Sequence, residues 1–123
     1  MDVLDKTQEM ARFLEQKLAE DVVILGMEGV SLMADYFIIA TGRNTRQTRA
    51  LSEYLELENK KEGILPLRIE GQNSGEWILM DYGDIIVHLF TAQQREFYNL
   101  EKLWGDALRV PVQAATGTDR TGE

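Results

Sequence analysis

The stretch from residue 76 to residue 90 constrains the fold of this chain most strongly. Two apolar runs, each about as long as a strand, lie on either side of a Tyr82-Gly83 pair. If this pair forms a two-residue loop, Asp81 lies opposite Asp84. A longer loop would shift the pairings between the strands but would leave the alternation within each strand unchanged. The pattern therefore predicts a β-hairpin.

Side-chain alternation divides this hairpin into two faces with different chemistry. One face is aliphatic throughout and is predicted to lie against a core; it carries Ile78, Met80, Ile85, Val87 and Leu89. The other face is an apolar stripe that ends in two carboxylates; it carries Trp77, Leu79, Asp81, Asp84, Ile86 and His88. We expect the function to lie on the second, mixed face.

The segments before the hairpin predict further strands and two helices. Helical spacing of apolar residues predicts helices over residues 3–20 and 45–62. Asn44 or Thr45 is placed to cap the second helix, and Gly63 is placed to end it. Short runs rich in aliphatic residues predict strands over residues 22–25, 36–40 and 65–70.

A last helix is predicted after the hairpin. Thr91 opens it, with Gln94 at the spacing of a capping box. Its expected packing stripe consists of Phe97, Leu100 and Trp104. After Gly105 the periodicity fades, which predicts a poorly ordered tail over residues 106–123.

The order of these elements indicates one domain over residues 1–105. We expect the α/β class, with an α+β mixed sheet of about five strands and flanking helices.

Composition narrows the classes of function. The chain has 123 residues, a formal net charge of −8 and no cysteine, which excludes disulfides and thiolate nucleophiles. No apolar run approaches the ~20 residues of a membrane span, and Asp2 and Asp5 stand where a signal peptide would carry basic residues. We therefore expect a cytoplasmic protein without membrane contact. The negative charge favours a basic protein surface as partner, with little direct nucleic-acid contact.

An ordered set of motifs resembles the ribosomal silencing factor family, RsfS, also called Iojap or YbeB-like. The motifs are residues 35–42 (DYFIIATG), 63–66 (GILP), 70–71 (EG), 77–78 (WI), 81–88 (DYGDIIVH) and 98–104 (YNLEKLW). The likeness runs from about Leu4 to Trp104. Each motif alone is modest, but the ordered set over some hundred residues is specific.

This resemblance implies a nucleotidyltransferase-like fold that has lost its enzyme activity. It also implies binding to the large ribosomal subunit through its ribosomal protein fourteen, on the surface that meets the small subunit. Such binding would block subunit joining, repress translation under nutrient limitation and keep immature large subunits apart. No cofactor or metal is expected.

The residues agree with a docking function on separate grounds. Desolvated apolar groups supply most of the affinity of an interface, whereas charges steer and orient the partner. Trp77 and Leu79, with Tyr98 from the last helix, are the predicted anchor. The predicted acidic rim consists of Asp81, Asp84 and Glu101.

Other interpretations apply to the same residues. Trp77 in a strand is also compatible with a core position, and the two aspartates with simple turn residues. His88, the only histidine, is expected to be structural because a metal site needs further nitrogen or sulfur ligands. Trp104 is expected to pack against the domain.

Two other classes of function compete with the ribosomal one. A two-metal enzyme would use Asp35, Asp81 and Asp84, with Ser74-Gly75 as a phosphate loop. The spacing of Asp81 and Asp84 and the lack of a glycine-rich loop with a lysine argue against it. A protein-binding adaptor or homodimer could use the same apolar stripe, and this alternative stays open.

Overall fold

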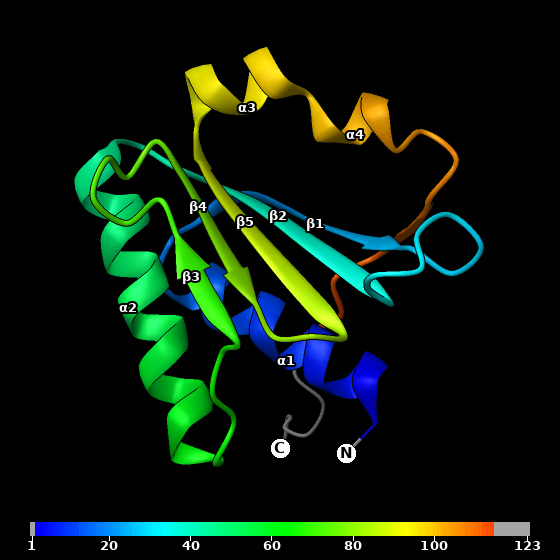
Figure 1. The fold of residues 1–123 in the computed structure, drawn as a ribbon. Helices are drawn as coiled ribbons and strands as arrows, with labels where there is room; N and C mark the ends of the chain where they lie inside the picture. The colour runs from blue at the N-terminus through cyan, green and yellow to red at the C-terminus, as the bar shows by residue number, and fades with distance from the viewer. Residues whose placement is uncertain (1, 115–123) are drawn as a thin grey trace.

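The computed structural model describes residues 2–114, which form one mixed sheet with flanking helices (Figure 1). The strands are β1 (Glu20–Gly26), β2 (Tyr36–Gly42), β3 (Arg68–Glu70), β4 (Trp77–Asp81), β5 (Ile85–Thr91) and β6 (Leu108–Val110). The helices are α1 (Val3–Gln16), α2 (Thr45–Lys61), α3 (Ala92–Tyr98) and α4 (Leu100–Leu103). The predicted α/β class is confirmed, with six strands in this part of the chain instead of about five. None of these helices is long and apolar enough to cross a membrane.

The strand order in the sheet is β3-β4-β5-β2-β1-β6. Only the central β2 and β5 run parallel, and every other neighbouring pair among these strands is antiparallel. Both central strands are almost wholly buried, as expected for near-continuous apolar runs that are covered on both faces.

The hairpin of β4 and β5 is confirmed, but the predicted pairing of Asp81 with Asp84 is wrong. Asp81 lies opposite Ile86 because residues 82–84, instead of Tyr82-Gly83 alone, connect the two strands. The Asp81 carboxylate accepts a hydrogen bond from the Gly83 N–H at 2.8 Å, and Gly83 takes the positive φ that this turn requires. The longer loop leaves the alternation of side chains intact, so the two predicted faces remain.

The aliphatic face of the hairpin lies against α1 and α2, as predicted. The resulting core joins residues of both helices to four strands; its largest members include Met10, Leu14, Ile24, Ile38, Leu51, Leu55, Ile78, Met80 and Leu89. Asp2 caps α1 by accepting from the Asp5 N–H, and Asn44 caps α2 by accepting from the Gln47 N–H. The helix α1 ends at Gln16 and not near residue 20.

The opposite face of the sheet carries a second, smaller core under α3, α4 and the loop that follows β1. This core contains Leu25, Met27, Ala34, Phe37, Ile39, Ile86, Phe90 and Leu100. The predicted last helix is broken at Asn99, which adopts a left-handed conformation (φ 46°) and caps α4. Thr91 forms no side-chain cap bond, and Phe97 is exposed, so the predicted capping box and packing stripe are wrong at these residues.

The segment after Gly105 differs from the expected tail. Leu108–Val110 forms β6, which pairs antiparallel with β1 along Ile24–Gly26. Beyond it, the Gln8 side chain donates to the Pro111 carbonyl and accepts from the Gln113 N–H, both at 2.8 Å. These contacts attach the segment to α1. The remainder of the expected tail, residues 115–123, lies outside the described residues.

Candidate protein-binding face

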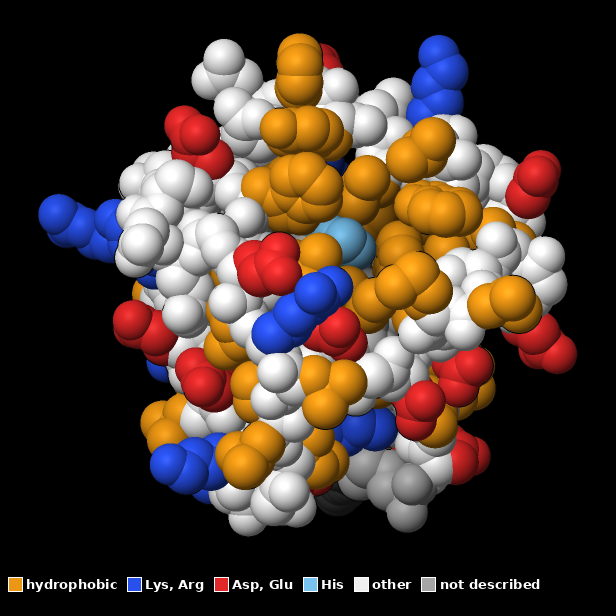
Figure 2. All heavy atoms as spheres, in the orientation of Figure 1, with side chains coloured by type: hydrophobic (Ala, Val, Ile, Leu, Met, Phe, Trp, Pro, Cys, Tyr) orange, Lys and Arg blue, Asp and Glu red, His pale blue; other side chains and the backbone are white. Residues whose placement is uncertain are grey.

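The sheet is incompletely covered where β4 and β5 run beneath α3. Figure 2 shows apolar side chains gathered around the histidine on this face, with charged side chains beside them. The mixed face of the hairpin predicted from the sequence lies here. We call the cluster formed by Trp77, Leu79, His88, Phe90 and Tyr98 the aromatic face.

Trp77 is the centre of the aromatic face. Its ring is stacked on Phe90 at a centroid distance of 5.1 Å and lies 4.5 Å from the ring of Tyr98. Its indole N–H donates to His88 Nδ1 at 3.1 Å. Trp77 is half-buried, so its exposure is intermediate between that of a core residue and that of an exposed interface residue, the two interpretations that the sequence allowed. Leu79, also half-buried, follows on the same face of β4.

His88 lies beneath these rings and is only 4% exposed. Burial lowers the pKa of His88 from 6.5 to about 4, so the imidazole is neutral at pH 7. Because Nδ1 accepts the indole hydrogen bond, the ring proton is assigned to Nε2, which has no partner among the described residues. His88 orients Trp77, as expected of a structural histidine.

The helical side of the face is a ridge of exposed apolar residues. Tyr98 is 43% exposed, Phe97 is 76% exposed and Leu103 is 68% exposed. The left-handed Asn99 separates α3 from α4 between these residues. The ridge and Trp77 together provide exposed aromatic and aliphatic surface.

Two of the predicted rim carboxylates are neutralised in part by arginines. Arg95 forms a bidentate ion pair with Glu101 at 3.0 and 3.1 Å, and Arg109 contacts the same carboxylate at 2.7 Å. The hydrogen bond from Arg95 lowers the pKa of Glu101. Asp81 lies 3.4 Å from Arg68. The rim is therefore less acidic than the sequence alone suggests.

Asp84 does not belong to the aromatic face. Its backbone carbonyl accepts from the N–H groups of Asp35 and Tyr36, which holds the β4–β5 loop against the start of β2. Its side chain is exposed and lines a cavity beside α1. Of the six predicted binding residues, the structure brings together Trp77, Leu79 and Tyr98, leaves Asp81 and Glu101 in ion pairs at the rim, and separates Asp84.

The sequence interpretation missed Phe90, which is fully buried beneath Trp77, and the exposed Phe97 and Leu103. Phe90 could have been found, because it follows His88 at the two-residue spacing of the strand. The exposure of Phe97 and Leu103 depends on the break at Asn99, which no periodicity predicts. Trp104 packs as predicted, edge-on to Phe37 at 5.9 Å.

The carboxylates do not assemble a metal centre in the described residues. No group of three or more histidine, cysteine, aspartate or glutamate side chains is placed to hold an ion there. The Asp81 carboxylate is engaged by Gly83 and Arg68. The arrangement offers an apolar surface for docking.

Comparison with known proteins agrees with this geometry. A family model described as "Ribosomal silencing factor during starvation" matches residues 1–123. A ribosomal silencing factor from Bacillus subtilis is 44% identical over 93 residues, covering 76% of this chain and 79% of that protein. A mouse protein named "Mitochondrial assembly of ribosomal large subunit protein 1" is 31% identical over 100 residues, covering 77% of this chain and 43% of the relative.

A crystal structure of a protein from Chromobacterium violaceum has a similar fold. The TM-score is 0.83 at 29% identity, and the match covers 97% of this chain and 98% of that one. The family match, the sequence identities and the shared fold all point to the same group of proteins. This chain belongs to the ribosomal silencing factor family.

Proposed function

We propose that this protein binds the large ribosomal subunit through ribosomal protein fourteen and sterically blocks joining of the small subunit, without performing catalysis. It would act in the cytoplasm, repress translation under nutrient limitation and contribute to large-subunit biogenesis. Membership of the ribosomal silencing factor family supports a ribosome-associated silencing role. The name of the mouse relative refers to the large subunit, which favours that subunit as the partner.

The observation that carries the proposal is the exposed aromatic face. Tyr98 and Trp77 are in contact, and Tyr98 keeps almost half of its surface accessible although it packs against the domain. Tryptophan and tyrosine are enriched among residues that dominate binding energy, because they bury large areas at low cost in side-chain entropy. This surface is therefore suited to a protein partner.

Electrostatics favour a basic partner at long range. The whole chain carries a net charge of −8, whereas the carboxylate of Glu101 beside the aromatic face is shared between two arginines. Long-range attraction would increase the association rate, and the rim ion pairs would reorganise little on contact. The affinity would then depend mainly on the apolar contact.

Self-association through the aromatic face is the second candidate. Phe97 is an exposed apolar side chain next to Tyr98, and Leu103 of α4 is also exposed; such a surface can pair with its own copy. A homodimer of this kind would cover the anchor and compete with ribosome binding. Sedimentation velocity of the free protein, with and without isolated ribosomal protein fourteen, distinguishes these uses.

The direct test uses purified ribosomal protein fourteen and the Tyr98→Ala variant. We expect the variant to weaken binding by about 2 kcal/mol, because it removes an exposed aromatic ring that contacts Trp77 at the centre of the aromatic face. The control is Leu57→Ala on α2, which removes an apolar side chain of comparable exposure (54%) far along the chain from the aromatic face. Equal affinities for Tyr98→Ala and the parent would exclude this face.

A further inference from the structure

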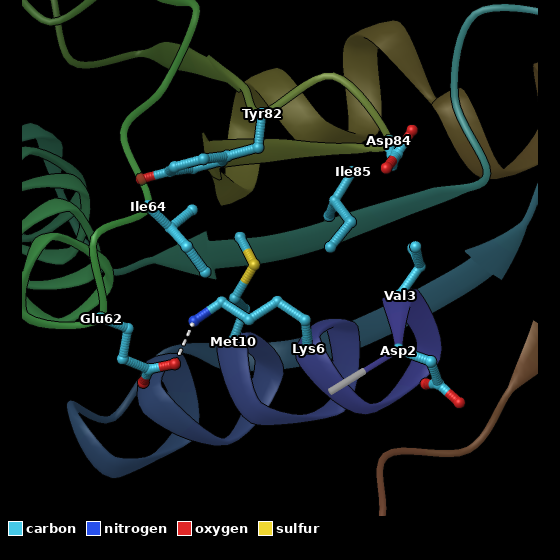
Figure 3. Close-up of a pocket in the computed structure, with 9 residues that line it drawn as sticks. All are labelled: Asp2, Val3, Lys6, Met10, Glu62, Ile64, Tyr82, Asp84 and Ile85. Carbon is cyan, nitrogen blue, oxygen red and sulfur yellow. Dashed lines mark hydrogen bonds and ion pairs between the residues drawn. The ribbon is translucent and has the colours of Figure 1, made fainter.

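A groove on the α1 side of the sheet is separate from the aromatic face. Two cavities of about 370 and 730 Å³ have Asp2 and Val3, at the N-terminal end of α1, in both of their linings. Figure 3 shows the smaller one, with Val3 and Met10 from α1 facing Tyr82 and Ile85 of the β4–β5 hairpin. The groove belongs to the end of the sheet where β2 and β5 begin, whereas Trp77 lies opposite Phe90 near the other end of β5.

One row of residues across the sheet lies beneath the two cavities: Leu108, Gly26 and Tyr36 line the larger cavity, and the buried Ile85 lines the smaller one. Leu108 of β6 pairs with Gly26 of β1, Gly26 pairs with Tyr36 of β2, and Tyr36 pairs with Ile85 of β5. Directly paired residues point to the same face of a sheet. Gly26 contributes no side chain, so the row is hollow between Leu108 and Tyr36.

A larger residue can replace Gly26 without backbone strain, but its side chain would fill the groove. Its φ is not in the left-handed region, and an added Cβ would lie 3.5 Å from the Leu108 carbonyl oxygen and 3.8 Å from Val110 Cγ2. These are ordinary contact distances. A valine at this position should therefore occupy the hollow while it remains compatible with the strand.

The rim of the groove carries an excess of unpaired negative charge. The acidic residues that line the two cavities are Asp2, Glu28, Asp35, Glu62, Asp84 and Asp106. Only Glu62 forms an ion pair among the described residues, with Lys6 at 3.3 Å. Among the residues that the structure describes, Lys6 is the sole basic residue in either lining, and it also contacts Glu9 at 2.8 Å. The Asp2 carboxylate caps α1, and the other four carboxylates face a cationic partner without an ion pair to the described residues.

The dimensions suit a short extended peptide. Two strand spacings of ~4.8 Å separate β6 from β2 across the lining of the larger cavity, which gives a floor of about 10 Å. An extended chain rises ~3.3 Å per residue, so about three residues span that floor. Because side chains of an extended peptide alternate, apolar ones can enter the hollow while basic ones meet the carboxylates.

We propose that this groove binds an extended, basic segment of a partner protein, in which aliphatic residues alternate with lysine or arginine. The groove is a second docking surface, independent of the aromatic face. The apolar floor provides contact area, and the unpaired carboxylates select positive charge. A ribosome-bound molecule could therefore hold a second protein through the opposite end of its sheet.

The test uses a fluorescein-labelled peptide of alternating lysine and leucine, titrated against the full chain at near-physiological salt. We expect Gly26→Val to weaken its binding about tenfold, because the apolar side chain can no longer enter the hollow. Ala50→Val on the exposed surface of α2 is the matched control and should change affinity less than about threefold. A lysine–serine peptide should bind more weakly than the lysine–leucine peptide.

A second pair of variants separates local from general charge attraction, and it also serves if Gly26→Val does not fold. The double variant Glu28→Lys/Asp106→Lys should weaken binding of the lysine–leucine peptide about tenfold. The double variant Glu15→Lys/Glu53→Lys changes the net charge by the same amount at exposed sites on α1 and α2. It should weaken binding of this peptide less than about threefold. Equal losses in both pairs, or equal binding of the lysine–serine peptide, would overturn the proposal.

Amide chemical shifts of the labelled full chain locate the peptide directly. The proposal expects peptide-induced shifts around Gly26, Tyr36 and Leu108, with little change around Trp77. Absence of binding, or shifts concentrated at the aromatic face, would refute it. Loss of a dimer on Gly26→Val would also refute it, because the occupant would then be a second copy of the chain.

Discussion

Acidification from pH 7 to pH 5 should destabilise the fold through His88. The buried imidazole has a pKa of about 4 in the folded protein against 6.5 ordinarily. Between these two values the unfolded chain binds a proton that the folded protein does not bind. Stability is therefore fully present above the unfolded pKa and is lost as the pH falls toward the folded pKa.

The size of the loss follows from the two pKa values. At pH 5 protonation of His88 shifts the folding equilibrium about thirtyfold toward the unfolded state, because the imidazole of the folded protein binds hardly any proton at this pH. This shift corresponds to a loss of about 2 kcal/mol in the free energy of unfolding. His88 is the only histidine of the chain, so no other imidazole titrates in this window. The lowered pKa of Glu101 acts at more acidic pH, where its carboxyl takes up a proton on unfolding.

Urea unfolding, monitored by tryptophan fluorescence, measures this loss of stability. We expect the unfolding free energy of the parent to fall by about 2 kcal/mol from pH 7 to pH 5. His88→Gln removes the titrating group, so its unfolding free energy should change little over the same range, whatever its absolute stability. A parent that is equally stable at both pH values, or a variant with the same pH dependence, would refute the burial of a neutral His88.

Trp77→Phe keeps an aromatic ring against Tyr98 but removes the N–H that donates to His88. The free energy of unfolding, measured in urea at pH 7, should fall by about 1–2 kcal/mol. An unchanged free energy of unfolding would contradict this hydrogen bond. Asp81→Asn keeps an oxygen that can accept from Gly83 but removes the charge at the rim. Stopped-flow mixing with large subunits should then show slower association with a weaker salt dependence, whereas unchanged kinetics would exclude Asp81 from steering.

The parts of the fold set by local periodicity were predictable. The alternation along β4 and β5 identified both faces of the hairpin, and helical spacing with an asparagine cap located α2. These signals depend on side chains that are close in sequence. The pairing of Asp81 was not predictable in this way, because an aspartate side chain that bonds to Gly83 stabilises a longer loop.

Features that depend on distant contacts were harder to predict. Strand β6 forms from a short segment of weak pattern because β1 offers a free edge and Gln8 holds the residues beyond it. The rim charge of Glu101 was misjudged for the same reason, since Arg109, one of its two partners, lies in that segment. The aromatic face was anticipated through Trp77, Leu79 and Tyr98, whereas its exposed ridge depends on the turn at Asn99.

The most direct test of the proposed silencing mechanism is a subunit-joining assay. Purified large and small ribosomal subunits are mixed under conditions that favour joined ribosomes, with and without this protein, and separated on a sucrose gradient. The account predicts that the protein sediments with the large subunit and that the joined peak is lost, while Tyr98→Ala restores it. Undiminished joining with the protein bound to the large subunit would contradict the steric mechanism, and absence of binding would contradict the ribosomal role.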